Sequence, residues 1–263
     1  MPPAISRWAA RYALGGNFFQ DFDGTWEEAL ASVRGYGDAA IIDQVTAATR
    51  AVENGDAAFE RDSVLFSEPE YTWPLVAALC HAAARDGHLR VIDFGGSLGS
   101  SYRQHRRYLD DMPDSLWAVV EQAEFVQIGQ REFSTDILSF HSTIAEAAAA
   151  IRPNVLLLGS SLQYLPSPEE ILREATATPA NTLILDRTPL SAAPDDRLTI
   201  QTVPARIYRA AYPMWVLSRS RLLDRVSPSW SVVATYESPF RRPRTAAGLE
   251  FGWDGLILSR GGT

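Results

Sequence analysis

The chain has 263 residues and a mass of 29.0 kDa; 46% of its residues are hydrophobic and 21% are charged, which predicts a globular protein with a large core. Its formal net charge of −8 argues against nucleic acid or an anionic membrane as a partner, so we expect a small-molecule substrate. The sequence has neither an apolar run long enough for a membrane helix nor a signal-peptide pattern, and a cytoplasmic location is expected. Oligomerisation is left open.

The residue types that are rare in this chain exclude several kinds of chemistry. A single cysteine, Cys80, excludes an internal disulfide and a thiolate zinc cluster. The four histidines never occur as HxxxH or HExxH, so no metal site is predicted. All basic residues are arginine, and the absence of lysine excludes Schiff-base catalysis, pyridoxal phosphate anchoring and a P-loop.

The first part of the chain, residues 1–88, is predicted to form a helical N-terminal cap. Apolar residues recur there every three or four positions, which predicts three helices between Thr25 and Asp86. Thr25 and Glu28 have the spacing of a capping box at the start of the first helix. The three segments are TWEEALASV, AAIIDQVTAATRAVENG and WPLVAALCHAAARDG.

From residue 89 onward, short apolar runs alternate with helical patterns, which is typical of a parallel sheet covered by helices. The predicted strands are LRVIDF, LWAVVE, ILSFH, NVLLLG and NTLILD, and the predicted crossover helices are SSYRQHRRYL, EFVQIGQREF, TIAEAAAAI and SPEEILREAT. Two β-rich runs near the C-terminus, SWSVVATYES and GLEFGWDGLILSR, are expected to add an antiparallel hairpin. We therefore predict an α/β, Rossmann-like domain over residues 89–263, with a seven-stranded, mostly parallel sheet and an insertion at about 188–225 over the active face.

The most informative local feature is a glycine-rich turn that follows the first of these strands, in VIDFGGSLGS. Glycine permits positive φ angles and a close approach of a ligand, and the following helix presents unpaired N–H groups. Glu121 ends the next strand, 26 residues after Gly95, where a carboxylate can accept hydrogen bonds from both hydroxyls of a ribose. The two features together favour a nucleotide-like cofactor. A structural turn beside a solvated glutamate is the alternative.

The glycine spacing separates the candidate cofactors. Ser97 and Ser100 stand where a GxGxxG dinucleotide turn needs glycine, which disfavours NAD and FAD. The pattern Asp93-x-Gly95-x-x-x-Gly99 resembles the first motif of class I S-adenosylmethionine-dependent methyltransferases. The strings FGGSLGSSY, VVEQ, LLGSSLQYLPSPEE, LILDRTPL and IYRAAYPMW, with GTWEEAL and ERDSVLFSEPEYTWPL, resemble a family of bacterial methyltransferases found with polysaccharide or secondary-metabolite genes. This resemblance covers most of residues 24–260.

The resemblance implies S-adenosyl-L-methionine as the cofactor and assigns positions around it. The glycine turn is expected to contact the methionine part, Glu121 the ribose, Gln122 the adenine or ribose, and His141 the adenine ring. The segment after the fourth strand is expected to line the groove near the reactive methyl group. The cofactor-binding residues predicted in this way are Asp93, Gly95, Gly96, Ser97, Gly99, Glu121, Gln122, Gly159, Ser160 and Ser161.

Methyl transfer needs the acceptor in line with the sulfur–methyl bond, and it needs a base only when the acceptor must lose a proton. Asp186 and His141 are the candidate bases, with an ion pair between Asp186 and Arg187 as the alternative for the former. Residues expected over the strand ends to contact the substrate are Tyr71, Trp73, Tyr102, Tyr164, Arg187, Tyr208, Tyr212 and Trp215. The expected reaction is methylation of oxygen or nitrogen on a small molecule such as a sugar or secondary metabolite. A nicotinamide-dependent oxidoreductase and a catalytically silent binding domain are the alternatives.

Overall fold

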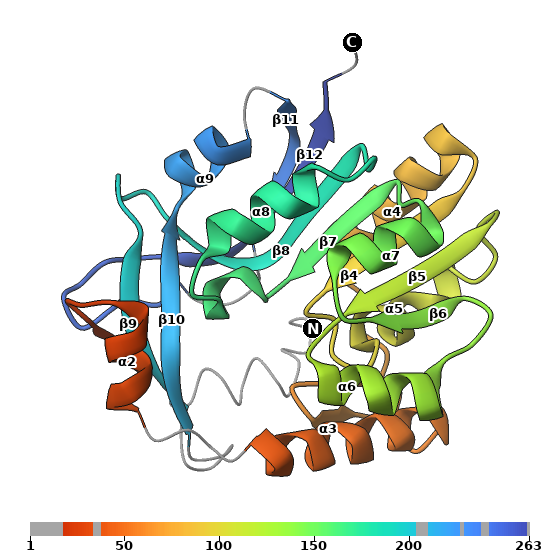
Figure 1. The fold of residues 1–263 in the computed structure, drawn as a ribbon, viewed down its shortest axis with the longest axis horizontal. Helices are drawn as coiled ribbons and strands as arrows, with labels where there is room; N and C mark the ends of the chain where they lie inside the picture. The colour runs from red at the N-terminus through yellow and green to blue at the C-terminus, as the bar shows by residue number, and fades with distance from the viewer. Residues whose placement is uncertain (1–17, 34–37, 204–209, 227–228, 238–241, 262–263) are drawn as a thin grey trace, which may run out of the picture.

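A computed structural model describes residues 18–33, 38–203, 210–226, 229–237 and 242–261. A central sheet has helices on both faces (Figure 1). Five strands run parallel in the spatial order β6-β5-β4-β7-β8. They are β4 (Leu89–Phe94), β5 (Ser115–Val120), β6 (Leu138–His141), β7 (Val155–Gly159) and β8 (Thr182–Ser191). The sheet confirms the predicted Rossmann-like α/β class.

The predicted C-terminal hairpin is also present and completes the sheet beside β8. It consists of β11 (Trp230–Tyr236) and β12 (Gly252–Arg260), and β12 pairs antiparallel with both β11 and β8. The predicted count of seven strands is too low, because β9 (Arg197–Val203), β10 (Ala210–Ser218) and β1 (Phe18–Asp21) extend the same sheet to ten strands.

Two apolar cores lie on opposite faces of the sheet, because the parallel strands are apolar on both sides. One face is covered by α3 (Asp38–Glu53), α4 (Trp73–Asp86), α5 (Ser100–His105) and α6 (Ala123–Ile128). The other is covered by α7 (Ile144–Ile151), α8 (Pro168–Thr176) and α9 (Arg219–Val226). Shorter turns of helix are η1 (Arg106–Tyr108), η2 (Gly129–Phe133) and η3 (Leu162–Tyr164). Among the described residues, no helix is both long and apolar enough to cross a membrane.

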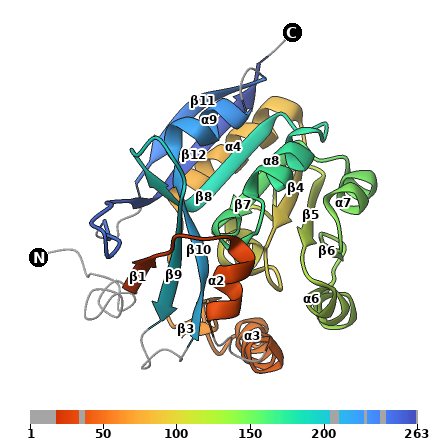
Figure 2. The ribbon, with the colours of Figure 1, turned by 60° about the vertical axis from the view of Figure 1, so that its left-hand side comes forward.

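Most of the described part of residues 188–225 forms strands and a helix. Strand β8 continues five residues beyond its predicted end at Asp186, because its second half pairs with β12 on one side and with β10 on the other. Strand β9 pairs with β10 and with β1. Helix α2 (Trp26–Ser32) packs on β10, as Figure 2 shows, and its capping box is confirmed. A small hairpin, β2 (Phe59–Arg61) and β3 (Val64–Phe66), precedes α4.

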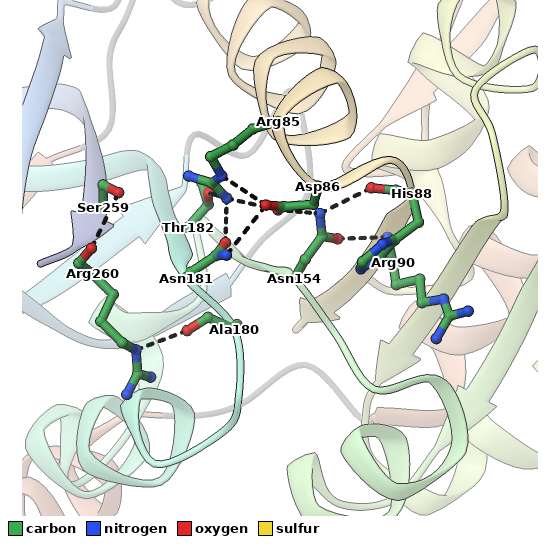
Figure 3. Close-up of polar contacts among 10 residues, drawn as sticks. All are labelled: Arg85, Asp86, His88, Arg90, Asn154, Ala180, Asn181, Thr182, Ser259 and Arg260. Carbon is green, nitrogen blue, oxygen red and sulfur yellow. Dashed lines mark hydrogen bonds and ion pairs between the residues drawn. The ribbon is translucent and has the colours of Figure 1, made fainter. Parts of the chain in front are cut away.

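The starts of the parallel strands are tied together by Asn154 (Figure 3). Its Oδ1 accepts the backbone N–H of Arg90 at 2.8 Å, and its Nδ2 donates to Asp86 Oδ2 at 2.8 Å and to the carbonyl of His88 at 3.0 Å. An open depression of about 590 Å³ lies here, lined partly by these residues. Because the polar atoms of Asp86 and Asn154 are bonded to neighbouring side chains or to the backbone, we assign this end of the sheet a structural role.

Candidate functional site

The glycine turn lies at the opposite end of the sheet, between β4 and α5. Gly95 has a φ of +71° and Gly99 a φ of +89°, both in the left-handed region. Ser97, between them, has a φ of +55°, which is strained for a residue with a Cβ. Ser160, at the end of the neighbouring strand β7, has a φ of +58°. Strained residues at two adjacent strand ends mark this edge as the candidate site.

The turn is packed closely against its surroundings. A Cβ at Gly95 would lie 2.6 Å from Ser161 Cβ, and a Cβ at Gly96 would lie 2.6 Å from Asp93 Cγ. The first contact joins the turn to the loop after β7. Both positions therefore require glycine for reasons of space.

Glu121 faces the turn from the end of β5. Its Oε1 accepts the backbone N–H of Ser97 at 3.2 Å, and its Oε2 accepts that of Gln122 at 2.8 Å. Burial raises the pKa of the Glu121 carboxyl, and the two N–H groups oppose that rise. The structure thus brings Glu121 and the glycine turn together, as the sequence analysis expects. Gln122, the next residue, lies exposed.

Asp93 lies beneath the turn, with only 1% of its surface exposed. Its Oδ2 accepts the indole N–H of Trp117 at 3.1 Å. Burial raises the pKa of Asp93 to about 7, although the Trp117 hydrogen bond opposes the shift. In this position Asp93 supports the turn from below.

The loop after β7 contributes polar groups to the same edge. The N–H of Ser160 donates to the carbonyl of Asp186 at 2.8 Å, and Gln163 Nε2 donates to Ser160 Oγ at 2.9 Å. Ser161 Oγ is buried and has no hydrogen-bond partner within the described residues, although it lies beside Gly95. A buried polar atom of this kind calls for a ligand or water. Gln163 is fully buried and was not predicted as part of the site.

Asp186 lies on β8, the strand next to β7, and two side chains contact its carboxylate. Its Oδ2 lies 3.1 Å from Arg187 Nε, and its Oδ1 accepts the hydroxyl of Tyr236 at 2.8 Å. Arg187 has a φ of +49°, and a Cβ at Gly159 would lie 3.7 Å from its Nη2. The ion pair is the arrangement that the sequence analysis names as the alternative to base catalysis. Sequence reasoning missed Tyr236, because only the pairing of β11 with β12 brings it near Asp186.

The two candidate bases lie far apart. His141 is on β6 and Asp186 on β8, and three strands separate them, which corresponds to about 19 Å at the usual strand spacing. His141 Nε2 lies 3.0 Å from Ser139 Oγ, and burial lowers the pKa of the imidazole. The two groups therefore cannot act together on one acceptor atom.

Two of the predicted substrate aromatics come together beside the loop after β7. The rings of Tyr164 and Tyr212 meet edge to face with centroids 5.3 Å apart, and the Tyr164 hydroxyl donates to Gln201 Oε1 at 3.0 Å. Trp215 points to the other face of β10, since side chains alternate along a strand. There it stacks on Trp26 at 6.1 Å.

Three further predicted substrate residues pack against aromatic neighbours of their own. Tyr71 and Trp73 pack with Tyr108 at the start of α4. Tyr102 is buried, donates its hydroxyl to Asp110 at 2.7 Å and packs on Trp117. Tyr208 lies outside the described residues.

The residues at this edge fit the adenosyl cofactor that the resemblance implies. A ribose needs a fixed hydrogen-bond acceptor, and Glu121 provides one beside the turn. The methionine part of the cofactor needs a close approach to the backbone, as at the glycine turn. Beside Gly95 in that turn, Ser161 Oγ has no hydrogen-bond partner among the described residues. No group of three metal-ligating side chains is found in the part of the chain that the structure describes.

No protein-family model and no curated protein sequence matches the chain. Among solved structures, the N-terminal domain of EvdMO1, in the presence of SAH and D-fucose, is 16% identical with a TM-score of 0.51, covering 86% of this chain and all of that one. The [4+2]-cyclase SpnF is 12% identical with a TM-score of 0.50, covering 85% of this chain and 95% of that one. At these identities the likeness concerns the fold. The chain has the Rossmann-like fold of class I S-adenosylmethionine-dependent methyltransferases.

Proposed function

We propose that this protein is an S-adenosylmethionine-dependent methyltransferase that methylates oxygen or nitrogen of a small molecule. The observation that carries the proposal is the contact between Glu121 and Ser97. It holds a partly buried carboxylate against a strained glycine turn at the carboxyl edge of the sheet, where ligands of open α/β sheets bind.

The bound cofactor would supply a methyl group on a sulfonium, which is electrophilic without further activation. Glu121 would accept hydrogen bonds from the ribose hydroxyls, and Gln122 and His141 would border the adenine, since both lie at strand ends on that side. The turn from Gly95 to Gly99 and Ser161 would hold the methionine part. The reactive carbon would then lie toward β7 and β8.

The acceptor would bind over β7, β8 and β10. Tyr164 and Tyr212, whose rings meet edge to face, would offer ring faces and edges there. Because both carboxylate oxygens of Asp186 are bound, we assign this residue first to holding Arg187 and Tyr236 in place. Removing a proton from the acceptor with Asp186 would require the Tyr236 hydrogen bond to open.

Substitution of Asp186 by Asn separates these two roles. Loss of a base would lower kcat by at least about a hundredfold and change the pH profile of kcat, because general bases contribute that much. Loss of a positioning group would raise KM for the acceptor and leave the shape of the pH profile unchanged.

A sugar-like acceptor is supported by the EvdMO1 domain, whose structure was determined in the presence of D-fucose. SpnF supports a second candidate function, because a [4+2]-cyclase has this fold as well. The two functions differ in whether the cofactor is consumed. Incubation with S-adenosylmethionine and candidate deoxysugars, followed by measurement of S-adenosylhomocysteine, distinguishes them.

Cofactor binding is tested by calorimetric titration with S-adenosylhomocysteine. We expect wild-type binding and a loss of at least about tenfold in Glu121→Ala, because the ribose would lose a charge-assisted hydrogen-bond acceptor. Glu124→Ala is the matched control, since Glu124 is exposed in the first turn of α6. Folded wild-type protein that does not bind S-adenosylhomocysteine would refute the proposal.

A further inference from the structure

Strand β11 forms one edge of the ten-stranded sheet (Figure 1). Among the described residues it pairs with β12 alone, so the backbone N–H and C=O groups on its outer side have no strand beside them. Trp230 at its start is buried and Tyr236 at its end is partly buried, whereas the five residues between them are all exposed. Because side chains alternate along a strand, both faces of the segment 231–235 are open as well as its edge.

The segment carries little that would keep it from pairing with another strand. Edge strands are commonly protected by charged side chains, by proline or by a bulge. Residues 230–236 include neither a charged residue nor a proline. A register shift between Val232 and Ala234 leaves Val233 without a partner on β12, but this irregularity protects no apolar surface. Val233 is 62% exposed and Val232 is 41% exposed, and β-branched residues of this kind favour strand pairing.

The sequence of the segment is nearly symmetric about Val233. Val232 and Ala234, both apolar, lie one position to either side. Ser231 and Thr235, both with hydroxyl groups, lie two positions to either side. If two copies paired antiparallel about a two-fold axis at Val233, apolar residues would face apolar residues and hydroxyls would face hydroxyls. Cross-strand pairs of both kinds stabilise a sheet.

The register shift at Val233 favours a second copy of this chain over a strand of another protein. A regular strand has no extra residue to place opposite Val233, so pairing with it would change register at this point. In a second copy related by the two-fold axis, the same extra residue lies opposite, and the ladder can resume on both sides. We propose that this protein forms a two-fold symmetric dimer in which the β11 strands of two copies pair antiparallel across Val233.

Sedimentation equilibrium of the wild-type protein is the first test. We expect a reversible equilibrium between a monomer of 29.0 kDa and a dimer of twice that mass. Because one strand pair is a small interface, the Kd should lie on the order of micromolar. A single monomeric species at all concentrations would overturn the inference. So would a series of species larger than a dimer, because pairing of β11 with a different edge, β1 or β6, gives rings or open polymers.

Val233→Lys and Val233→Glu test the position of the axis. Each variant alone places like charges opposite one another and should weaken dimerisation at least about tenfold. An equal mixture of the two should recover the dimer, because unlike charges then face each other. Val233 is exposed, so both variants should keep the wild-type midpoint of urea denaturation. Unchanged dimerisation of the separate variants, or a mixture that remains monomeric, would overturn the inference.

Leu65→Lys is the matched control, since Leu65 is an aliphatic residue on β3 that is 48% exposed. It should dimerise as the wild type does, and an equal loss in this variant would show that added charge alone is responsible and overturn the inference. These measurements need neither cofactor nor acceptor, so their outcome is independent of the proposed function.

Discussion

Tyr236 reaches Asp186 across an intervening strand. Tyr236 is on β11 and Asp186 on β8, and β12 lies between them, yet the hydroxyl donates to Oδ1 at 2.8 Å. The ring passes over Gly255 of β12, where a Cβ would lie 2.0 Å from Tyr236 Cζ. Burial and the nearby Asp186 charge raise the pKa of the Tyr236 hydroxyl, so it remains a hydrogen-bond donor at neutral pH.

Gly255→Ala should displace this ring and destabilise the fold by about 1–3 kcal/mol, the usual cost of an overpacked site. Tyr236→Phe keeps the ring and removes only the hydrogen bond, so it should cost about 1–2 kcal/mol. Urea denaturation measures both. Gly261→Ala is the control, because a Cβ there would meet nothing closer than 3.9 Å. If Gly255→Ala were as stable as the control, the ring would not need this glycine.

Asn154→Ala should destabilise the protein by about 2–3 kcal/mol, since it leaves a buried N–H and a carbonyl without their partners. The same substitution should raise the pKa of Asp86, because hydrogen bonds from Arg85 and then Asn154 hold that pKa at about 2. Because this pKa is below the unfolded value, Asp86 stabilises the fold above about pH 4 and ceases to do so as the pH falls toward 2. Asn54→Ala, at an exposed site after α3, is the control. Equal stability of the two variants would contradict the structural role of Asn154.

His105 should make stability depend on pH. Its Nε2 accepts the N–H of Thr72 at 3.1 Å and its Nδ1 lies 2.8 Å from the carbonyl of Ser101, which requires the neutral ring. Burial lowers the pKa of His105 to about 4. Between pH 6.5 and pH 4 the unfolded state binds a proton that the folded state does not, so stability falls by about 3 kcal/mol as the pH falls through this range.

His105→Gln should remove this part of the pH dependence, as measured by urea denaturation at pH 7 and pH 4.5. His81→Gln is the control, because His81 is exposed on α4. The prediction fails if both variants lose as much stability as the wild type between the two pH values.

Asp93 should make stability depend on pH in the direction opposite to His105. Its folded pKa of about 7 is above the unfolded value near 3.9, so the folded state retains a proton between these values and stability falls as the pH rises through them. Asp93→Asn can keep the Trp117 hydrogen bond without a buried charge. It should therefore be about 2–4 kcal/mol more stable than the wild type at pH 8, with exposed Asp111→Asn as the control. Equal or lower stability of Asp93→Asn at pH 8 would contradict a buried, near-neutral carboxyl.

Local patterns predicted the parts of the fold that depend on local physics. The capping box at Thr25 forms with both of its hydrogen bonds, at 2.8 and 3.2 Å, because its partners are three residues apart. The parallel strands follow from apolar runs separated by helical periodicity. Strand β8 runs past its predicted end at Asp186 because its later residues pair with β10 and β12, which are distant in sequence.

The candidate site divides in the same way. The sequence analysis groups Tyr102 with the aromatic residues expected to contact the substrate. In the structure, Tyr102 is buried in the core and packs against Trp117. Tyr236 has no local signal, because it reaches Asp186 through a strand whose position is set by long-range pairing. Sequence by itself determined the five parallel strands, the glycine turn and the carboxylate after the next strand, since backbone conformation and strand alternation are local. The tertiary structure alone decided that Tyr236 meets Asp186 at the strand ends, because this contact depends on the pairing of strands that are far apart along the chain.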